Sequence, residues 1–295
     1  MFTRFMRYVF AFFFLACLLG CMDPGNLKLI DNVPTSLDEI SGLQLVKLEG
    51  FDKPFLAAIN DSGNSASLYL YQDNSRIHSI TIQGVKNKDW EDVTVIKDGS
   101  GHATDIIIAD IGDNSQSRDD IQLIKVPLPK DGIMPESISG TTYNMTYKNG
   151  KSRNAEAVIY RNDSVFVFSK ESEKGYDFFS KVFAARLGDK ELKKQYEIGI
   201  ENLPNKQKVT AADINDVGQV ALLSRRYVFT YPFNQLKKSL VVPKVYDLKH
   251  SSQKEGLTYI NDSTLYLADE LKKGTGGNMY QFTLRDSFLK LATKK

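Results

Sequence analysis

The polar and apolar positions of the chain repeat one pattern five times. Each copy begins with small polar residues and an acid, enters a short apolar run, turns, and enters a second apolar run with a polar or charged end. The acids that open the copies are Glu39, Glu91, Glu156, Asp213 and Glu255. Short apolar runs bounded by Gly, Asn and Asp are typical of β-strands joined by turns. Each copy therefore predicts an antiparallel strand pair.

Further strand-like runs follow each pair, such as SLYLYQ and IHSITI after the first and IQLIKVPL and TTYNMTY after the second. Four strands per copy are typical of a propeller blade. We predict an all-β fold, a five-bladed β-propeller of four-stranded blades. The fifth copy lacks an outer strand, and LKLIDNV (27–33) can supply it and close the ring. Closure of this kind protects the strand edges of the first and last blades.

A six-bladed ring is the alternative. It would need a further blade between residues 91 and 156, where the strand-like runs account for only one. Helical spacing outside the N-terminal segment is confined to short pieces near 188–197 and 286–292.

The N-terminal segment has a different character. Arg4 and Arg7 precede an apolar run, VFAFFFLACLLG (9–20), which is too short to span a bilayer comfortably. The tetrad LLGC (18–21) resembles a bacterial lipobox, in which the cysteine is lipidated; FLAC, ending at Cys17, is a poorer match. We predict that residues 1–21 are a lipoprotein signal peptide with lipidated Cys21. Residues 22–295 then form a single domain, exported and lipid-anchored at the bacterial cell envelope.

Charge and composition narrow the chemistry. The formal net charge of +2 gives no reason to expect a nucleic acid partner. Both cysteines lie in the predicted signal, so the mature chain would have no disulfide, cysteine metal site or cysteine nucleophile. The three histidines show no zinc-site spacing: His78, His102 and His250.

The repeated acids predict a site. In an antiparallel pair the start of the first strand lies beside the end of the second, so all five copies place polar groups at one mouth of a central channel. Clustered carboxylates must be protonated, paired with cations or bound to a metal, and oxygen ligands favour calcium or magnesium. We predict a calcium site drawn from Glu39, Glu91, Asp110, Asp113, Glu156, Asp213 and Glu255. The alternative is architectural, with the acids locking adjacent blades.

The ends of the second strands differ in charge between copies, which favours a role in specificity. We predict ligand contacts at Asn60, Asp61, Lys170, Arg225 and Asp269. Trp90, the only tryptophan, is a further ligand candidate as a wall of the mouth, or it packs between the first two blades. The polar loops 60–67 and 113–120 lack EF-hand spacing and are better explained as turn chemistry.

Several of these motifs together resemble the SdiA-regulated family of bacterial β-propellers. They are EISGL (39–43), NAEAV (154–158), FSKES (168–172), ADI (212–214), LLSRR (222–226), KEGLTY (254–259) and LADE (267–270). DWEDV (89–93) with ADIGDN (109–114) is also similar to related exported propellers. The resemblance spans about residues 37–284 and implies a five-bladed, calcium-binding propeller at the cell envelope. Asp213 departs from the glutamate of the other copies, which puts its place in a ring in doubt.

Three classes of function follow. The first is a lipoprotein, a monomer held to the membrane by its lipid, that binds a small molecule or a protein at the acidic mouth. The second is a calcium-dependent hydrolase of the lactonase or phytase type, for which Glu91, Asp110, Asp113 and Glu255 could act. The third is a structural module. No nucleophile elbow or phosphate loop appears, so catalytic residues stay unassigned.

Overall fold

The computed structural model describes residues 27–72, 76–235, 239–285 and 288–289. The predicted signal peptide and Cys21 lie outside the described residues. Among the described residues, no helix is long and apolar enough to cross a membrane.

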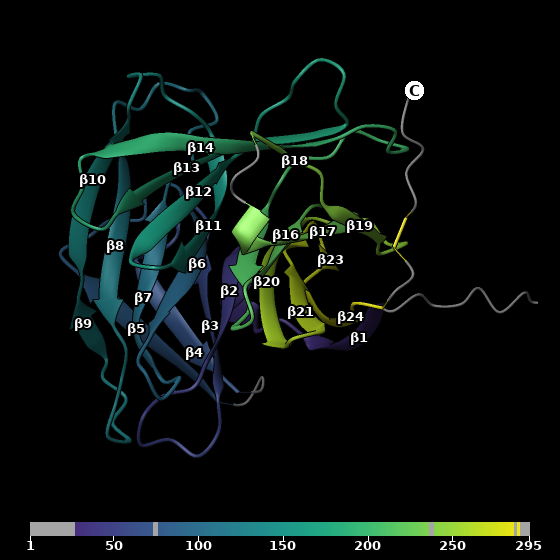
Figure 1. Cartoon of the computed structure of the whole chain (residues 1–295). Helices are drawn as coiled ribbons and strands as arrows, with labels where there is room; N and C mark the ends of the chain where they lie inside the picture. The colour runs from purple at the N-terminus through teal and green to yellow at the C-terminus, as the bar shows by residue number, and fades with distance from the viewer. Residues whose placement is uncertain (1–26, 73–75, 236–238, 286–287, 290–295) are drawn as a thin grey trace, which may run out of the picture.

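The described strands form antiparallel units of four, in the order of the sequence repeat (Figure 1). A parallel pairing of Thr146 with Glu191 and of Tyr147 with Leu192 joins the second and third units into one nine-stranded sheet. The first unit contains β2 (Ile40–Val46), β3 (Phe55–Asn60), β4 (Ser67–Tyr71) and β5 (Ile77–Gln83), with β9 (Ser137–Ser139) parallel to β5. The second contains β6 (Trp90–Lys97), β7 (Ala103–Asp110), β8 (Ile121–Pro127) and β10 (Thr141–Tyr147). The third contains β11 (Ala155–Arg161), β12 (Ser164–Ser169), β13 (Phe178–Arg186) and β14 (Glu191–Ile200), with β18 (Leu240–Val241) beside β14.

The fourth unit contains β15 (Ala211–Ile214), β16 (Gln219–Leu223), β17 (Tyr227–Pro232) and β19 (Lys244–Asp247). The fifth contains β20 (Lys254–Asn261), β21 (Thr264–Asp269), β24 (Asn278–Thr283) and β1 (Leu27–Asn32). The remaining elements are short: η1 (Thr35–Leu37), η2 (Phe233–Gln235), β22 (Leu271–Lys272) and β23 (Thr275–Gly276). These pairings confirm the all-β architecture, and we interpret each unit as one blade. The helical spacing near 188–197 was misleading, because β14 runs through it as a strand hydrogen-bonded to β13.

The N-terminal strand β1 closes the fifth unit, as the sequence predicts. It pairs antiparallel to β24, with Leu27 opposite Phe282 and Leu29 opposite Tyr280. The outer edge of β24 is therefore covered by a segment from the other end of the described chain.

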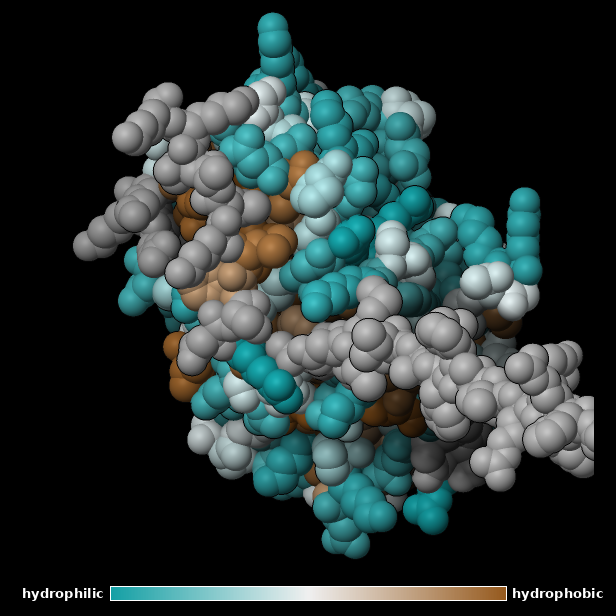
Figure 2. Space-filling model, turned by 90° about the vertical axis from the view of Figure 1, so that its right-hand side faces the viewer, coloured by the Kyte–Doolittle hydropathy of each residue, from teal (hydrophilic) through white to brown (hydrophobic). Residues whose placement is uncertain are grey.

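The apolar side chains form five core clusters, each shared by two neighbouring units. Along β3, for example, Phe55 and Ala57 pack towards the second unit, whereas Leu56 and Ala58 pack towards the fifth. Because side chains alternate across a strand, a strand between two cores is apolar on both faces. This explains why the sequence shows continuous apolar runs. Hydrophilic side chains cover most of the described part of the face in Figure 2.

The first strand of each unit lies at the centre of the molecule (Figure 1). These inner strands contact one another in a closed order, β2, β6, β11, β15, β20 and back to β2. In each unit the start of the inner strand pairs with the end of the second strand, for example Trp90 with Asp110 and Lys254 with Asp269. The sheet topology thus places the start of each inner strand and the end of each second strand around one mouth.

Candidate functional site

Side chain to backbone hydrogen bonds between units fix which inner-strand positions are equivalent. Thr94 Oγ1 accepts the N–H of Tyr160 in the next unit at 3.0 Å. Asp213 Oδ2 accepts the N–H of Tyr259 at 2.7 Å, and Thr258 Oγ1 accepts the N–H of Leu45 at 2.9 Å. Thr94, Asp213 and Thr258 therefore occupy the same position in their units.

In each unit, the residue three positions before that one belongs to a ring around the mouth, which we call the mouth ring. Its members are polar and only 2 to 8% exposed: Ser41, Glu91, Glu156, Thr210 and Glu255. Three repeat acids thus do converge, together with two hydroxyl groups. The other two acids lie elsewhere. Glu39 is exposed in the loop before β2, where its Oε2 accepts the side-chain amide of Asn64 at 2.6 Å.

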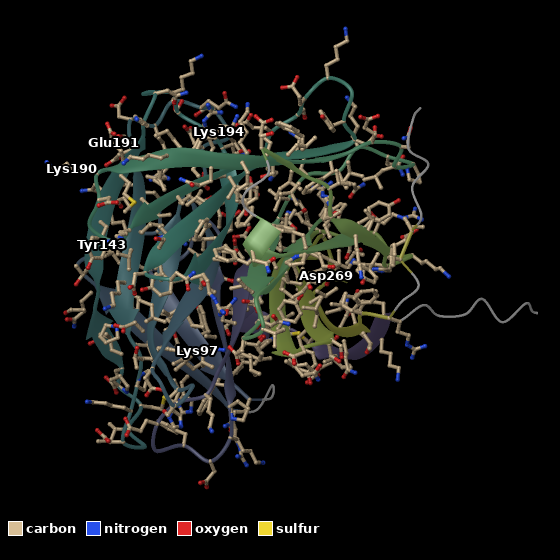
Figure 3. All side chains as sticks on the ribbon, in the orientation of Figure 1. Lys97, Tyr143, Lys190, Glu191, Lys194 and Asp269 are labelled. Carbon is tan, nitrogen blue, oxygen red and sulfur yellow. The ribbon has the colours of Figure 1, made fainter. Side chains whose placement is uncertain are left out.

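Asp213 lies deeper along its strand than the mouth ring. It lines a separate polar cavity of about 400 Å³ at the far ends of the inner strands, together with Gln44 and Lys97. Lys97, labelled in Figure 3, is ion-paired there with Asp216 at 2.9 Å. Burial raises the pKa of Asp213 to about 6. The correct register of the repeat can be read from the sequence. ISGL (40–43) aligns with KEGL (254–257) on Gly-Leu, so the residue equivalent to Glu255 is Ser41 and not Glu39.

A single carboxylate occupies the axis beneath the mouth ring. The residue after each ring member is small in four units, where it is Gly42, Ala157, Ala211 or Gly256, and is Asp92 in the second. Asp92 is 0% exposed and accepts the backbone N–H groups of Val93 (2.8 Å), Val158 (2.9 Å) and Ala212 (3.2 Å).

Asp92 therefore ties three inner strands together and separates the mouth from the lower cavity. Burial raises its pKa, while the three N–H donors favour its ionised form and oppose that rise. Asp92, the neighbour of a repeated acid, thus has the architectural role that was the alternative prediction for the repeated acids themselves.

Glu156 is the best-compensated acid of the mouth ring. Its Oε2 lies 2.6 Å from Lys170 Nζ, and its Oε1 accepts the amide of Asn154 at 2.9 Å. Burial raises the pKa of Glu156, and Lys170 counteracts this. Burial opposes the charge of Lys170 in turn, but Glu156, Glu255 and Glu91 together outweigh it and raise the lysine pKa. Burial, followed by repulsion from Glu156, raises the pKa of Glu91 well above its usual range.

Glu91 also belongs to a second group of carboxylates, the acidic trio. Oxygens of Asp61, Asp89 and Glu91 all lie within 4.8 Å of one another. Burial raises the pKa of both aspartates; repulsion from Glu39 adds to the rise at Asp61, and repulsion from Asp61 adds to the rise at Asp89. A Cβ at Gly112 would lie 2.1 Å from Glu91 Oε1 and 2.4 Å from Asp89 Oδ2. The missing side chain of Gly112 thus leaves the space that these two carboxylates use.

Asn60 ends β3 immediately before Asp61 and is 3% exposed. Its Nδ2 donates to the carbonyl of Ser36 at 2.9 Å, whereas its Oδ1 has no hydrogen-bond partner in the described part of the chain. A buried acceptor without a donor costs roughly 1–3 kcal/mol. This oxygen is thus free to bind a cation or a donor.

Two further acids extend the negative region. Burial, followed by repulsion from Glu156, raises the pKa of Glu255 well above its usual range. Burial raises the pKa of Glu270, next to Asp269, to about 7, and Asp61 adds to that rise. The sequence places Asp269 and Glu270 together at the end of a second strand, in the motif LADE, but the predicted ligand contact was Asp269 and not Glu270.

Asp110 and Asp113 lie near the mouth, but other groups already satisfy them. Asp110 is fully buried, with its Oδ1 2.7 Å from Arg118 Nη1. Asp113 accepts the backbone N–H groups of Ser117 and Arg118, both at 2.9 Å, and so shapes the loop that follows β7. This is the turn chemistry that the sequence favoured for the loop.

Two predicted ligand contacts have no access to the mouth. Trp90 is 0% exposed and packs in the core cluster between the first two units, which corrects its assignment as a mouth wall in favour of the packing alternative. Asp269, labelled in Figure 3, is also 0% exposed; it accepts the N–H of Asn278 at 2.7 Å and the hydroxyl of Tyr280 at 3.0 Å. Both are held by their own blades. Lys170 reaches the mouth, and Arg225 is exposed beside it.

Comparison with known proteins supports the fold. No protein-family model matches the sequence, and no curated protein sequence matches it significantly. The structure is similar to the PQQ-bound aldose sugar dehydrogenase of Streptomyces coelicolor, with a TM-score of 0.50, 9% identity and coverage of 87% of this chain and 97% of that one.

Two weaker likenesses are virginiamycin B lyase of Staphylococcus aureus (TM-score 0.43, 10% identity, 88% and 99% covered) and the calcium-binding protein regucalcin of Agrobacterium tumefaciens (0.44, 11%, 87% and 94%). The chain is thus a β-propeller protein.

Proposed function

We propose that this chain is an envelope-anchored propeller lipoprotein of the SdiA-regulated type that binds a ligand or partner at its mouth through a calcium ion. The observation that carries the proposal is the acidic trio, whose oxygens lie within 4.8 Å of one another. Asp61, Asp89 and Glu91 would hold the ion.

The donor set fits a hard cation. Calcium takes six to eight oxygen ligands, and the trio offers oxygens alone. The raised pKa values of Asp61, Asp89 and Glu91 indicate carboxylates that lack sufficient positive charge. A divalent ion would supply that charge and displace protons from them. Once bound, it would offer open coordination positions to a ligand's anionic or carbonyl oxygens.

Calcium is expected to stabilise the folded protein. We would measure the melting temperature of the mature chain, residues 22–295, in EDTA at pH 8 and then over a calcium series. An ion that binds only the native state stabilises by mass action, by about 2.7 kcal/mol at a hundredfold excess over its Kd. The melting temperature should rise with the logarithm of calcium concentration.

The matched variants are Glu91→Gln, inside the trio, and Glu191→Gln, an exposed glutamate on β14 that is labelled in Figure 3. Glu91→Gln should lose most of the calcium response and Glu191→Gln should keep it. A calcium-independent melting temperature in the unaltered protein would rule out the cation and leave the trio an architectural role.

Lipid anchoring is tested separately. The full chain, expressed in a bacterial host, should partition into the detergent phase of a Triton X-114 extraction when Cys21 is present. Cys21→Ala should move it to the aqueous phase, and Cys17→Ala should leave it in the detergent phase. Equal partitioning of the Cys21→Ala protein would contradict the lipoprotein assignment.

A further inference from the structure

A second hollow opens beside the mouth ring, between the third, fourth and fifth units. It has a volume of about 520 Å³, within the range of small-molecule sites. We call it the basic pocket and define it by residues from its wall: Lys170, Tyr176, Lys206, Lys208, Thr210 and Arg225. Glu255 of the mouth ring also lines it, so the basic pocket and the mouth are continuous.

The charges along the wall are not balanced. Glu171, an acid of the wall, is already paired with Arg153 at 2.5 Å and Lys181 at 2.6 Å. The carboxylate of Asp177 accepts the backbone N–H of Leu203 at 3.1 Å.

In contrast, no described carboxylate forms an ion pair with the side chains of Lys206, Lys208 or Arg225. The one remaining acid of the wall, Glu255, is outnumbered by these three cations. The pocket therefore has an excess of positive charge.

Thr210 provides an independent sign of a missing ligand. It is a member of the mouth ring, 4% exposed, and its Oγ1 has no hydrogen-bond partner among the described residues. Thr210 is also a lining residue of the basic pocket, so a ligand bound there could supply the hydrogen-bond partner that this oxygen lacks. The wall also offers ring surface, because Tyr176 and Phe179 both line the pocket, with ring centroids 5.3 Å apart.

We propose that the basic pocket binds a small organic anion with a planar ring. Its phosphate or carboxylate group would lie against Lys208, Arg225 and the hydroxyl of Thr210, and its ring would pack on Tyr176. Guanidinium and ammonium groups form strong charge-assisted hydrogen bonds with such anions, and a tyrosine face accepts a planar ring. This proposal rests on the ligand-binding function proposed above and names its ligand class.

Phenyl phosphate is a suitable probe, with inorganic phosphate and phenol as controls for the anion and the ring alone. Isothermal titration of the mature chain would be done in EDTA, so that the pocket is tested without a cation, and repeated with calcium. We expect phenyl phosphate to bind at least about tenfold more tightly than either control, because the pocket engages both of its parts. Benzoate in place of phenyl phosphate tells a carboxylate from a phosphate ligand.

The variants test the named contacts. Lys208→Gln and Arg225→Gln should each weaken phenyl phosphate binding about tenfold, the worth of one hydrogen bond to a charged group. Thr210→Val should weaken it about threefold while leaving the melting temperature unchanged, because no protein hydrogen bond is lost. Lys148→Gln, an exposed lysine on the second unit, should bind like the unaltered protein.

Equal binding of phenyl phosphate and inorganic phosphate would overturn the proposal that the basic pocket binds a ring-bearing anion. Unchanged binding in Lys208→Gln and Arg225→Gln would also overturn it. These results are independent of the calcium series. Calcium stabilisation without phenyl phosphate binding would contradict only the proposed anion site in the basic pocket. Phenyl phosphate binding without calcium stabilisation would contradict only the proposed calcium site.

Discussion

Replacing Asp92 with alanine is expected to lower the free energy of unfolding by about 4 kcal/mol, because a buried donor left unsatisfied costs roughly 1–3 kcal/mol. The Asp92 carboxylate accepts backbone N–H groups of Val93, Val158 and Ala212, which belong to three successive units. Alanine would leave these donors without an acceptor on an axis with no room for repacking. Chemical denaturation in EDTA measures the change.

Two variants make the Asp92 result specific. Asp92→Asn keeps one acceptor oxygen and should lose about half as much, since part of the hydrogen bonding survives. Asp119→Ala removes an exposed carboxylate from the same unit and should change stability by less than about 0.5 kcal/mol. An Asp92→Ala protein as stable as Asp119→Ala would mean that the axial hydrogen bonds do not hold the units together.

Replacing Lys170 with methionine is expected to cost about 3 kcal/mol of stability at pH 8, near the lower end for breaking a buried ion pair because the lysine is partly exposed. The Lys170 side chain is 26% exposed and that of Glu156 only 3%. Its loss would leave Glu156 unpaired close to Glu91 and Glu255. Denaturation in EDTA at pH 5 and pH 8 measures the effect.

The expected pH dependence has a definite sign. Lys170 lowers the pKa of Glu156, which burial raises, so the pKa of Glu156 should rise further in Lys170→Met. At pH 5 the variant can protonate Glu156 and needs no counter-charge, so the stability loss should shrink; it should grow as pH rises, when the unfolded chain releases the proton more readily. Calcium at pH 8 should recover part of the loss. Equal losses at both pH values would assign the effect to packing.

The fold was predictable because two separate signals agreed. Apolar runs bounded by turn residues located the strands, and their recurrence indicated repeated units. The closing role of residues 27–33 followed from a missing fourth strand in the last copy. The segment near 188–197 shows where a local pattern misleads, because pairing of β14 with β13 overrides its helical spacing.

The site was predictable only in part. Glu91, Glu156 and Glu255 belong to the mouth ring, as the repeat predicted. Aligning the five copies on their acids, however, wrongly assigned Glu39 and Asp213 to the same ring. Ser41 and Thr210 occupy the mouth-ring positions in their units. They are recognised because they are polar and buried, whereas a search for charged residues misses them. The sequence could not show whether the side chains of Trp90 and Asp269 face the core or the mouth. Side chains alternate between the two faces of a strand, and a bulge reverses that alternation. One such bulge lies between Trp90 and Asp92.

The pairing of β1 with β24 imposes an order on how the protein is made. Residue 27 leaves the ribosome early, yet its partner, Phe282, is synthesised near the end. Until then β1 has an unpaired edge, and its Leu29 and Ile30 remain 63% and 42% exposed even after folding. Unpaired apolar strands of a growing chain aggregate readily. We therefore expect this chain to depend on a holding chaperone between synthesis of its first strand and its last.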